Sequence, residues 1–158
     1  MQDARRSQWD IIIFLSGVLA VVLFDRLSKN YFSGLLDLNE SINFIPNILH
    51  FTLVHNTGIA FGFFKDCGAV FIIIPVILTG LLIYNVCYYR HSPQLSRTYI
   101  VAFSLILGGA IGNLFDRIFL GYVIDFIDFR VWPVFNVADS AITIGAAIIL
   151  LKCIPASK

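Results

Sequence analysis

The sequence contains four long apolar segments, and these constrain the fold more than any other feature. They cover residues 10–25, 68–89, 99–115 and 136–154 and consist mainly of Val, Ile, Leu, Phe, Ala and Gly. A helix of roughly 20 apolar residues satisfies its own backbone hydrogen bonds while it crosses a bilayer. Of all residues, 58% are hydrophobic and 13% are charged, far from the balance of a soluble domain. We therefore expect one domain, residues 1–158, that is an all-α polytopic membrane protein with four transmembrane helices.

Two segments between the spans favour extended structure. Residues 49–55 and 122–129 are rich in β-branched and aromatic residues, and Asn56-Thr57-Gly58 is a turn signal. Residues 35–48 mix turn formers with apolar residues, and residues 59–64 offer an apolar face suited to the membrane interface. We expect a small extracytoplasmic β platform beside the helices.

The distribution of charge predicts the orientation in the membrane. Six Lys and Arg residues lie in the short segments 1–10, 90–98 and 152–158, whereas only five lie in the much longer segments 25–67 and 116–139. The side richer in positive charge is cytoplasmic, so we expect both termini inside. Eight of the ten acidic residues fall on the other side. The acidic chemistry is therefore expected at the outer face.

Four polar residues stand in or beside apolar surroundings near the fourth span. They are Asp125, Asp128, Asn136 and Asp139. A carboxylate in such surroundings is costly unless it is paired, neutralised or used in function. On a strand, Asp125 and Asp128 face opposite ways, so one is expected to point inward. Asp139 stands at a helix start, where the dipole stabilises negative charge.

Two further pairs lie at span ends, and each has two interpretations. Asp25 and Lys29 form either an interfacial ion pair, in which Lys29 reaches towards water, or part of a site. Asn113 and Arg117 share a helix face. Arg117 either favours the helix C-terminus beside Asp116 or points with Asn113 into the bundle.

Five sequence blocks together resemble the bacterial lipoprotein signal peptidases, the type II signal peptidases. The blocks are Asp25-x-x-Ser28-Lys29, Asn56-Thr57-Gly58-x-Ala60-Phe61-Gly62, Gly108-Gly109-x-x-Gly112-Asn113-x-x-Asp116-Arg117, Val123-x-Asp125-Phe126-Ile127 and Phe135-Asn136-x-Ala138-Asp139-Ser140. They follow the family order over most of the chain. In this chain Arg26 stands where the family usually has Gln, and Ile59 where a small residue is common.

The resemblance implies a membrane aspartic endopeptidase that removes the signal peptide from diacylglyceryl-modified prolipoproteins, cutting before the lipidated Cys. It implies a bacterial cytoplasmic (inner) membrane location and Asp125 and Asp139 as catalytic residues. The matching substrate-binding positions are Asp25, Lys29, Asn56, Gly58, Asn113, Arg117 and Asn136. We expect a monomer whose partners are the prolipoprotein and the bilayer, with no metal, cofactor or nucleic acid.

The chemistry of the residues agrees with this resemblance. Two close aspartates in an apolar pocket share one proton. Asp139 at its helix start is the better ionised member, and Asp125 among Val, Ile and Phe the better protonated one. Asp116 and Asp128 are not expected to be catalytic, because Asp116 adjoins Arg117 and Asp128 adjoins Arg130 in a loop open to solvent.

Two other functions use intramembrane acids. A metal-dependent lipid phosphotransferase would bind Mg²⁺ through Asp116, Asp125, Asp128 and Asp139, but their spacing does not form a compact helical ligand set. A transporter or channel would carry its acids at mid-span, and these lie at span ends. Sensitivity to a chelator separates the first alternative from the peptidase.

Overall fold

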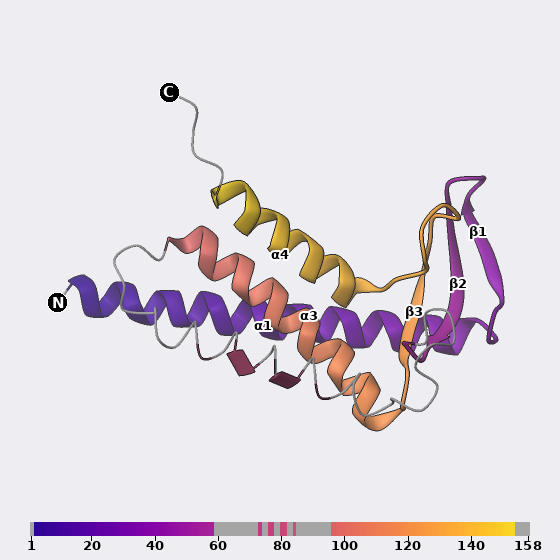
Figure 1. The fold of residues 1–158 in the computed structure, drawn as a ribbon, viewed down its shortest axis with the longest axis horizontal. Coiled ribbons are helices and arrows are strands. Elements are labelled where there is room, and N and C mark those ends of the chain that lie inside the picture. The colour runs from indigo at the N-terminus through magenta and orange to yellow at the C-terminus, as the bar shows by residue number, and fades with distance from the viewer. Residues whose placement is uncertain are drawn as a thin grey trace.

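The computed structural model describes residues 2–58, six single positions between 73 and 84, and 96–153. Three helices, α1 (Gln2–Leu35), α3 (Arg97–Phe119) and α4 (Val137–Cys153), form one part of the molecule (Figure 1). The strands β1 (Ser41–Ile45), β2 (Leu49–Asn56) and β3 (Val123–Asp128) form the other. Two segments, Gln8–Leu35 and Arg97–Phe119, are long and apolar enough to cross a membrane. The structure is thus mostly helical with a small three-stranded sheet.

The helix α1 is longer than the predicted span 10–25. It continues through Asp25, Arg26 and Lys29 to Leu35. These charged residues do not end the helix, because Lys29 pairs with Asp25 one turn earlier at 2.8 Å and both side chains are buried. The additional turns, which include Arg26 and Lys29, extend α1 from the helix bundle to the sheet.

Only part of the second predicted span, 68–89, lies within the described residues. Its described positions, at 73, 76, 77, 80, 81 and 84, are all helical. The rest of that span and the apolar face predicted over 59–64 lie outside the described residues.

Two glycines on α3, Gly108 and Gly109, let it approach α1 and α4 closely. A Cβ at Gly108 would lie 2.7 Å from the Cβ of Val21 on α1, and one at Gly109 would meet the backbone of Ala138 on α4. Contacts this close exclude any larger side chain. The helix α3 therefore brings α1 and α4 together.

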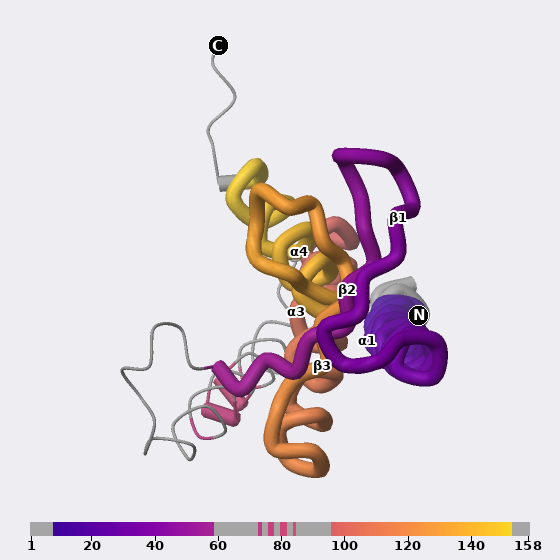
Figure 2. The backbone as a smooth tube through the Cα atoms, turned by 90° about the vertical axis from the view of Figure 1, so that its right-hand side faces the viewer, coloured from indigo at the N-terminus to yellow at the C-terminus, as the bar shows by residue number. Residues whose placement is uncertain are grey.

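The sheet has the order β1-β2-β3 and is antiparallel throughout. It lies at the end of α1 opposite the N-terminus (Figures 1 and 2). Leu36, Leu53 and Ile124 form a buried apolar cluster at this junction, and Phe32 of α1 stacks on Phe126 of β3 with ring centroids 4.4 Å apart. This packing fixes β3 against the end of α1.

Asp125 and Asp128 are both buried, but their carboxylates have different hydrogen-bond partners, and only Asp125 bonds to Asn136. Their exposed fractions are 1% and 6%, because β3 is covered along nearly its whole length. Asp128 is the last residue of the strand and not part of an open loop. Its carboxylate accepts hydrogen bonds from Thr52 Oγ1 and from the Arg130 backbone N–H, both at 2.7 Å.

Candidate active site

Asp125 is held by two side-chain amides. Its Oδ2 accepts a hydrogen bond from Asn56 Nδ2 at 2.8 Å, and its Oδ1 accepts one from Asn136 Nδ2 at 2.6 Å. Burial raises the pKa of Asp125 to about 6, and the nearby charge of Asp139 acts in the same direction, while the two amides oppose the rise. A carboxyl group with this pKa can exchange a proton near neutral pH.

The turn after β2 orients the amide of Asn56. Asn56 Oδ1 accepts the backbone N–H of Gly58 at 2.9 Å, which leaves its Nδ2 to face Asp125. Gly58 has φ +76°, a left-handed conformation that glycine adopts without a steric penalty. The Asn56-Thr57-Gly58 turn predicted from sequence therefore presents one donor to the carboxylate.

Asp139 lies in the first turn of α4 and is partly exposed. Its Oδ1 accepts from Asn113 Nδ2 at 2.7 Å, and its Oδ2 accepts from the backbone N–H of Asn136 at 3.3 Å. Asn136 Oδ1 in turn accepts the backbone N–H of Asp139 at 2.9 Å. This reciprocal capping fixes Asp139 at the helix start, where the dipole favours its negative charge.

Asn113 and Asn136 join the two carboxylates. Asn136 Nδ2 donates to Asp125 and also lies 3.0 Å from Asn113 Oδ1, while Asn113 Nδ2 donates to Asp139. Asn136 is fully buried, and Asn113 is 5% exposed. A continuous series of hydrogen bonds thus runs from Asp125 through two amides to Asp139.

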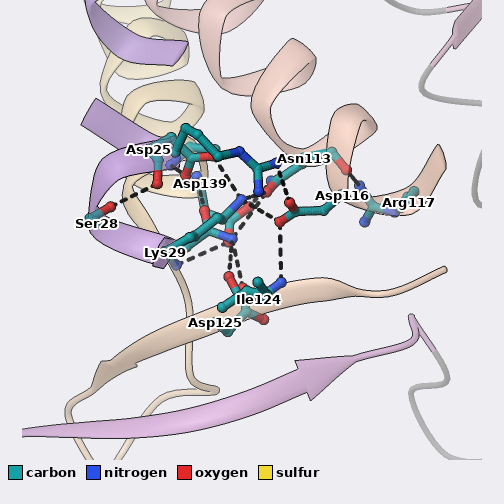
Figure 3. A network of polar contacts seen from close by, with 12 residues as sticks. Asp25, Ser28, Lys29, Asn113, Asp116, Arg117, Ile124, Asp125 and Asp139 are labelled. Atoms are coloured by element: carbon teal, nitrogen blue, oxygen red, sulfur yellow. Dashed lines mark hydrogen bonds and ion pairs between the residues drawn. The ribbon is translucent and has the colours of Figure 1, made fainter. Parts of the chain in front are cut away.

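An ion cluster supports this series from α1 (Figure 3). Lys29 Nζ lies 2.8 Å from Asp25 Oδ2, 2.8 Å from Asp116 Oδ2 and 3.0 Å from Asn113 Oδ1. Asp25 Oδ1 accepts the backbone N–H of Ala138 in the first turn of α4 at 3.0 Å. Lys29 is fully buried, so the interpretation in which it reaches towards water is wrong.

Asp116 has different ion partners from the one predicted. Its Oδ1 lies 2.6 Å from Arg26 and its Oδ2 contacts Lys29, whereas sequence proximity suggested Arg117. Arg26 also stacks over Phe115 at 4.3 Å from the ring centroid. Arg26 and Lys29 together balance the charges of Asp25 and Asp116.

Arg117 lies beside the amide series. It is partly buried, and its Nη1 donates to the backbone carbonyl of Asn113 at 3.4 Å. Asp139 and Asp125 are both within its electrostatic reach. This position favours the interpretation in which Arg117 and Asn113 face the site.

The structure brings most of the predicted site residues into one hydrogen-bonded network. Its members are Asp25, Lys29, Asn56, Asn113, Asp125, Asn136 and Asp139, with Gly58 and Arg117 bonded to Asn56 and Asn113. Sequence reasoning missed Asp116, which joins the ion cluster to β3 by accepting the backbone N–H of Ile124 at 3.2 Å. Its spacing of three residues from Asn113 on one helix was the available signal.

A pocket of about 420 Å³ opens beside Asp139, and most of its lining is apolar. The residues that line it are Phe129, Trp132, Phe135, Asp139, Ser140, Thr143 and Ile144. An apolar pocket with a carboxylate at its wall suits a ligand that has an acyl or other apolar part.

Two interacting carboxylates beside helices able to cross a membrane are typical of a membrane-embedded aspartic hydrolase. Comparison with known proteins gives the family. The family model described as signal peptidase (SPase) II matches residues 17–155, and the chain belongs to that family. The resemblance inferred from the sequence blocks is confirmed.

Individual relatives and solved structures agree with the family match. The chain is 42% identical over 134 residues to the lipoprotein signal peptidase of Halothermothrix orenii, covering 85% of this chain and 90% of the relative. It is 37% identical to that of Pseudomonas syringae pv. tomato, covering 100% and 96%. A solved bacterial membrane enzyme superposes with a TM-score of 0.80 at 31% identity, covering 95% of both chains.

Proposed function

We propose that this signal peptidase II cleaves diacylglyceryl-modified prolipoproteins before the lipidated Cys, with Asp125 and Asp139 as its catalytic pair. The observation that carries the proposal is the hydrogen-bond series that joins the two carboxylates through Asn136 and Asn113. An aspartic peptidase needs two carboxyl groups that differ in protonation and keep a fixed relative geometry. The series supplies the fixed geometry, and the different surroundings supply the difference in protonation.

In the proposed reaction the pair holds one proton. Ionised Asp139 takes a proton from water as the water oxygen attacks the scissile carbonyl, and protonated Asp125 donates a hydrogen bond to the developing oxyanion. Asp139 then passes the acquired proton to the leaving amine nitrogen as the C–N bond breaks. The products are the free signal peptide and a lipoprotein with a new N-terminal Cys.

The predicted substrate-binding residues divide into two groups. Asn56, Gly58 and Arg117 keep exposed surface, and we assign them to contacts with the substrate backbone near the scissile bond. Asp25, Lys29 and Asn136 are fully buried and Asn113 is nearly so. We assign these four an action on the substrate through the residues they hold. The apolar pocket beside Asp139 is suited to an apolar part of the precursor.

The proposed mechanism uses proton transfer without a metal. Both oxygens of Asp125 accept hydrogen bonds from amides, and both oxygens of Asp139 accept hydrogen bonds from N–H donors. Mg²⁺ is bound through carboxylate oxygens that converge on one point, whereas here the oxygens of each carboxylate face N–H donors. The donor arrangement therefore favours a proton-sharing pair over a metal-ligand set.

The membrane arrangement is part of the same proposal. We place a single domain of four spans in the bacterial inner membrane as a monomer, with both termini cytoplasmic and the site at the outer face. The exposed apolar side chains Leu15, Leu19 and Leu23 on α1 support contact with lipid. The sheet lies at the end of α1 away from the N-terminus (Figure 1), and Asp125 lies on β3 of this sheet.

Cleavage of purified precursors tests the function. Protein in detergent should convert a diacylglyceryl-modified precursor into signal peptide and lipoprotein, while the same precursor without the lipid should remain intact. Excess EDTA should not change the rate. Equal cleavage of both precursors would contradict the substrate assignment, and inhibition by EDTA that Mg²⁺ reverses would favour the metal-dependent alternative.

A further inference from the structure

We propose that Lys29 is a positioning residue that fixes both catalytic carboxylates through two separate connections. The proposal rests on the proposed roles of Asp125 and Asp139. It gives Lys29 a task other than the contact with substrate that the sequence resemblance implied.

The surroundings of the Lys29 ammonium group leave it no donor for a substrate. The group has three N–H bonds, and three acceptors lie within 3.0 Å of it: Asp25 Oδ2, Asp116 Oδ2 and Asn113 Oδ1. The residue has 0% exposure. A direct contact with substrate would therefore require one of these bonds to break.

The first connection runs through Asn113 to Asp139. An amide can turn its oxygen or its nitrogen towards a given neighbour, and only one of these orientations donates to a carboxylate. Lys29 can only donate, so its position 3.0 Å from Asn113 requires the oxygen there and directs Nδ2 to Asp139 Oδ1, 2.7 Å away. Lys29 thereby selects the orientation that keeps Asp139 hydrogen-bonded.

The second connection runs through Asp116 to Asp125. Lys29 holds Asp116 Oδ2 at 2.8 Å, and the same oxygen accepts the backbone N–H of Ile124 at 3.2 Å. Ile124 immediately precedes Asp125 on β3, so this bond sets the position of the strand relative to α3. Figure 3 shows Lys29 lying between the helices and this strand.

Removal of the ammonium group should therefore lower turnover without weakening substrate binding. A small misplacement of a catalytic group costs up to about 10²-fold in rate, so Lys29→Met should lower kcat by about 10- to 100-fold. KM for the diacylglyceryl-modified precursor should stay within about threefold of wild type. Lys152→Met, which changes an exposed lysine on α4, is the matched control and should leave both constants unchanged.

A second variant separates an effect on catalysis from an effect on folding. It is needed because Lys29→Met leaves Asp25 and Asp116 without this cation. Lys29→Arg keeps the charge, but a planar guanidinium cannot direct one nitrogen at all three acceptors. It should accumulate and still show reduced kcat. Failure of both variants to accumulate would assign Lys29 to folding alone and overturn the proposal.

A double-mutant cycle tests whether Lys29 acts through Asn113. If it does, the loss of kcat in Lys29→Arg combined with Asn113→Ala should be clearly smaller than the sum of the two single losses, the remainder being the part that passes through Asp116. Fully additive losses, a rise in KM with unchanged kcat, or full kcat in Lys29→Arg would each overturn the proposal. Asp139→Asn is assayed in parallel: activity in that variant would contradict the proposed function itself, whatever Lys29 does.

Discussion

Asp125 and Asp139 differ in their surroundings, and the proposed mechanism gives them different tasks for this reason. Asp125 lies on a covered strand with an exposed fraction of 1%, which disfavours its charged form. Asp139 lies at a helix start beside a pocket and accepts two N–H hydrogen bonds, and the proposed mechanism uses it as the ionised member. The apolar neighbours of Asp125 and the helix start at Asp139 predict the same division from sequence, and it stays a prediction.

The pH dependence of kcat/KM should report Asp125. Its pKa is raised to about 6, so the pair holds its shared proton below about pH 6 and loses it above. Because the mechanism needs that proton, kcat/KM should fall about tenfold per pH unit on the alkaline side. Asn56→Ala removes a hydrogen bond that favours the ionised form, so it should move this fall to higher pH.

A matched variant in the same turn controls for that shift. Thr57→Ala leaves the bond between Asn56 and Asp125 in place, and its profile should fall at the same pH as wild type. The measurement is the initial cleavage rate at low substrate over a pH series. A profile of Asn56→Ala that stays in place or moves to lower pH would contradict the assignment of this limb to Asp125.

The pairing of Lys29 with Asp25, one turn apart on α1, was one of the interpretations offered by the sequence, but the long-range partners of the buried charges could not be predicted from it. Lys29 and Asp116 are far apart in the chain, and nothing local indicates that they meet. Arg117, adjacent to Asp116, was the nearer candidate, but adjacent residues on a helix point in different directions. Sequence therefore identified which residues form the site, and only packing showed which of them bond to one another.

The helix α3 packs closely against both α1 and α4. Gly112 faces Asp25, and a Cβ at Gly112 would lie 2.6 Å from Asp25 Oδ2. Asp25 is fixed by Lys29 and the Ala138 backbone N–H, so it cannot move aside without breaking one of these contacts.

Gly112→Ala should therefore destabilise the protein by about 1–3 kcal/mol, the usual range for overpacking. Gly34→Ala is the matched control, because a Cβ there meets nothing within 4 Å. The thermal stability of both variants in detergent is measured as the cleavage activity that remains after heating. Equal stability of the two variants would contradict the close contact between α1 and α3.

The elements themselves were predictable to different degrees. Apolar composition located α3 and α4, and β-forming residues located β2 and β3. β1 (Ser41–Ile45) was not separated from its surroundings, since turn formers and apolar residues alternate there. The extension of α1 was missed because charged residues normally mark the end of a span, and here buried ion pairs compensate their cost.

For the whole molecule, the distribution of Lys and Arg predicts a defined orientation in the membrane. A reporter fused after Lys158 should behave as cytoplasmic, and one inserted at the β1–β2 turn, at Pro46 and Asn47, as external. The physical reason is the higher density of Lys and Arg in the segments placed inside. The opposite pattern would place both aspartates on the side where secreted precursors have not yet emerged.

The proposed mechanism requires Asp125 and Asp139 to act together. The most direct test is the cleavage of diacylglyceryl-modified precursor by Asp125→Asn, Asp139→Asn and, as the matched control, Asp128→Asn. General acid–base catalysis contributes roughly 10²- to 10⁴-fold, so each of the first two variants should lose activity at or beyond the upper end of that range while still accumulating in the membrane. Asp128→Asn should keep substantial activity, because its carboxylate is bonded to Thr52 and Arg130. Substantial cleavage by Asp125→Asn or Asp139→Asn would contradict the account.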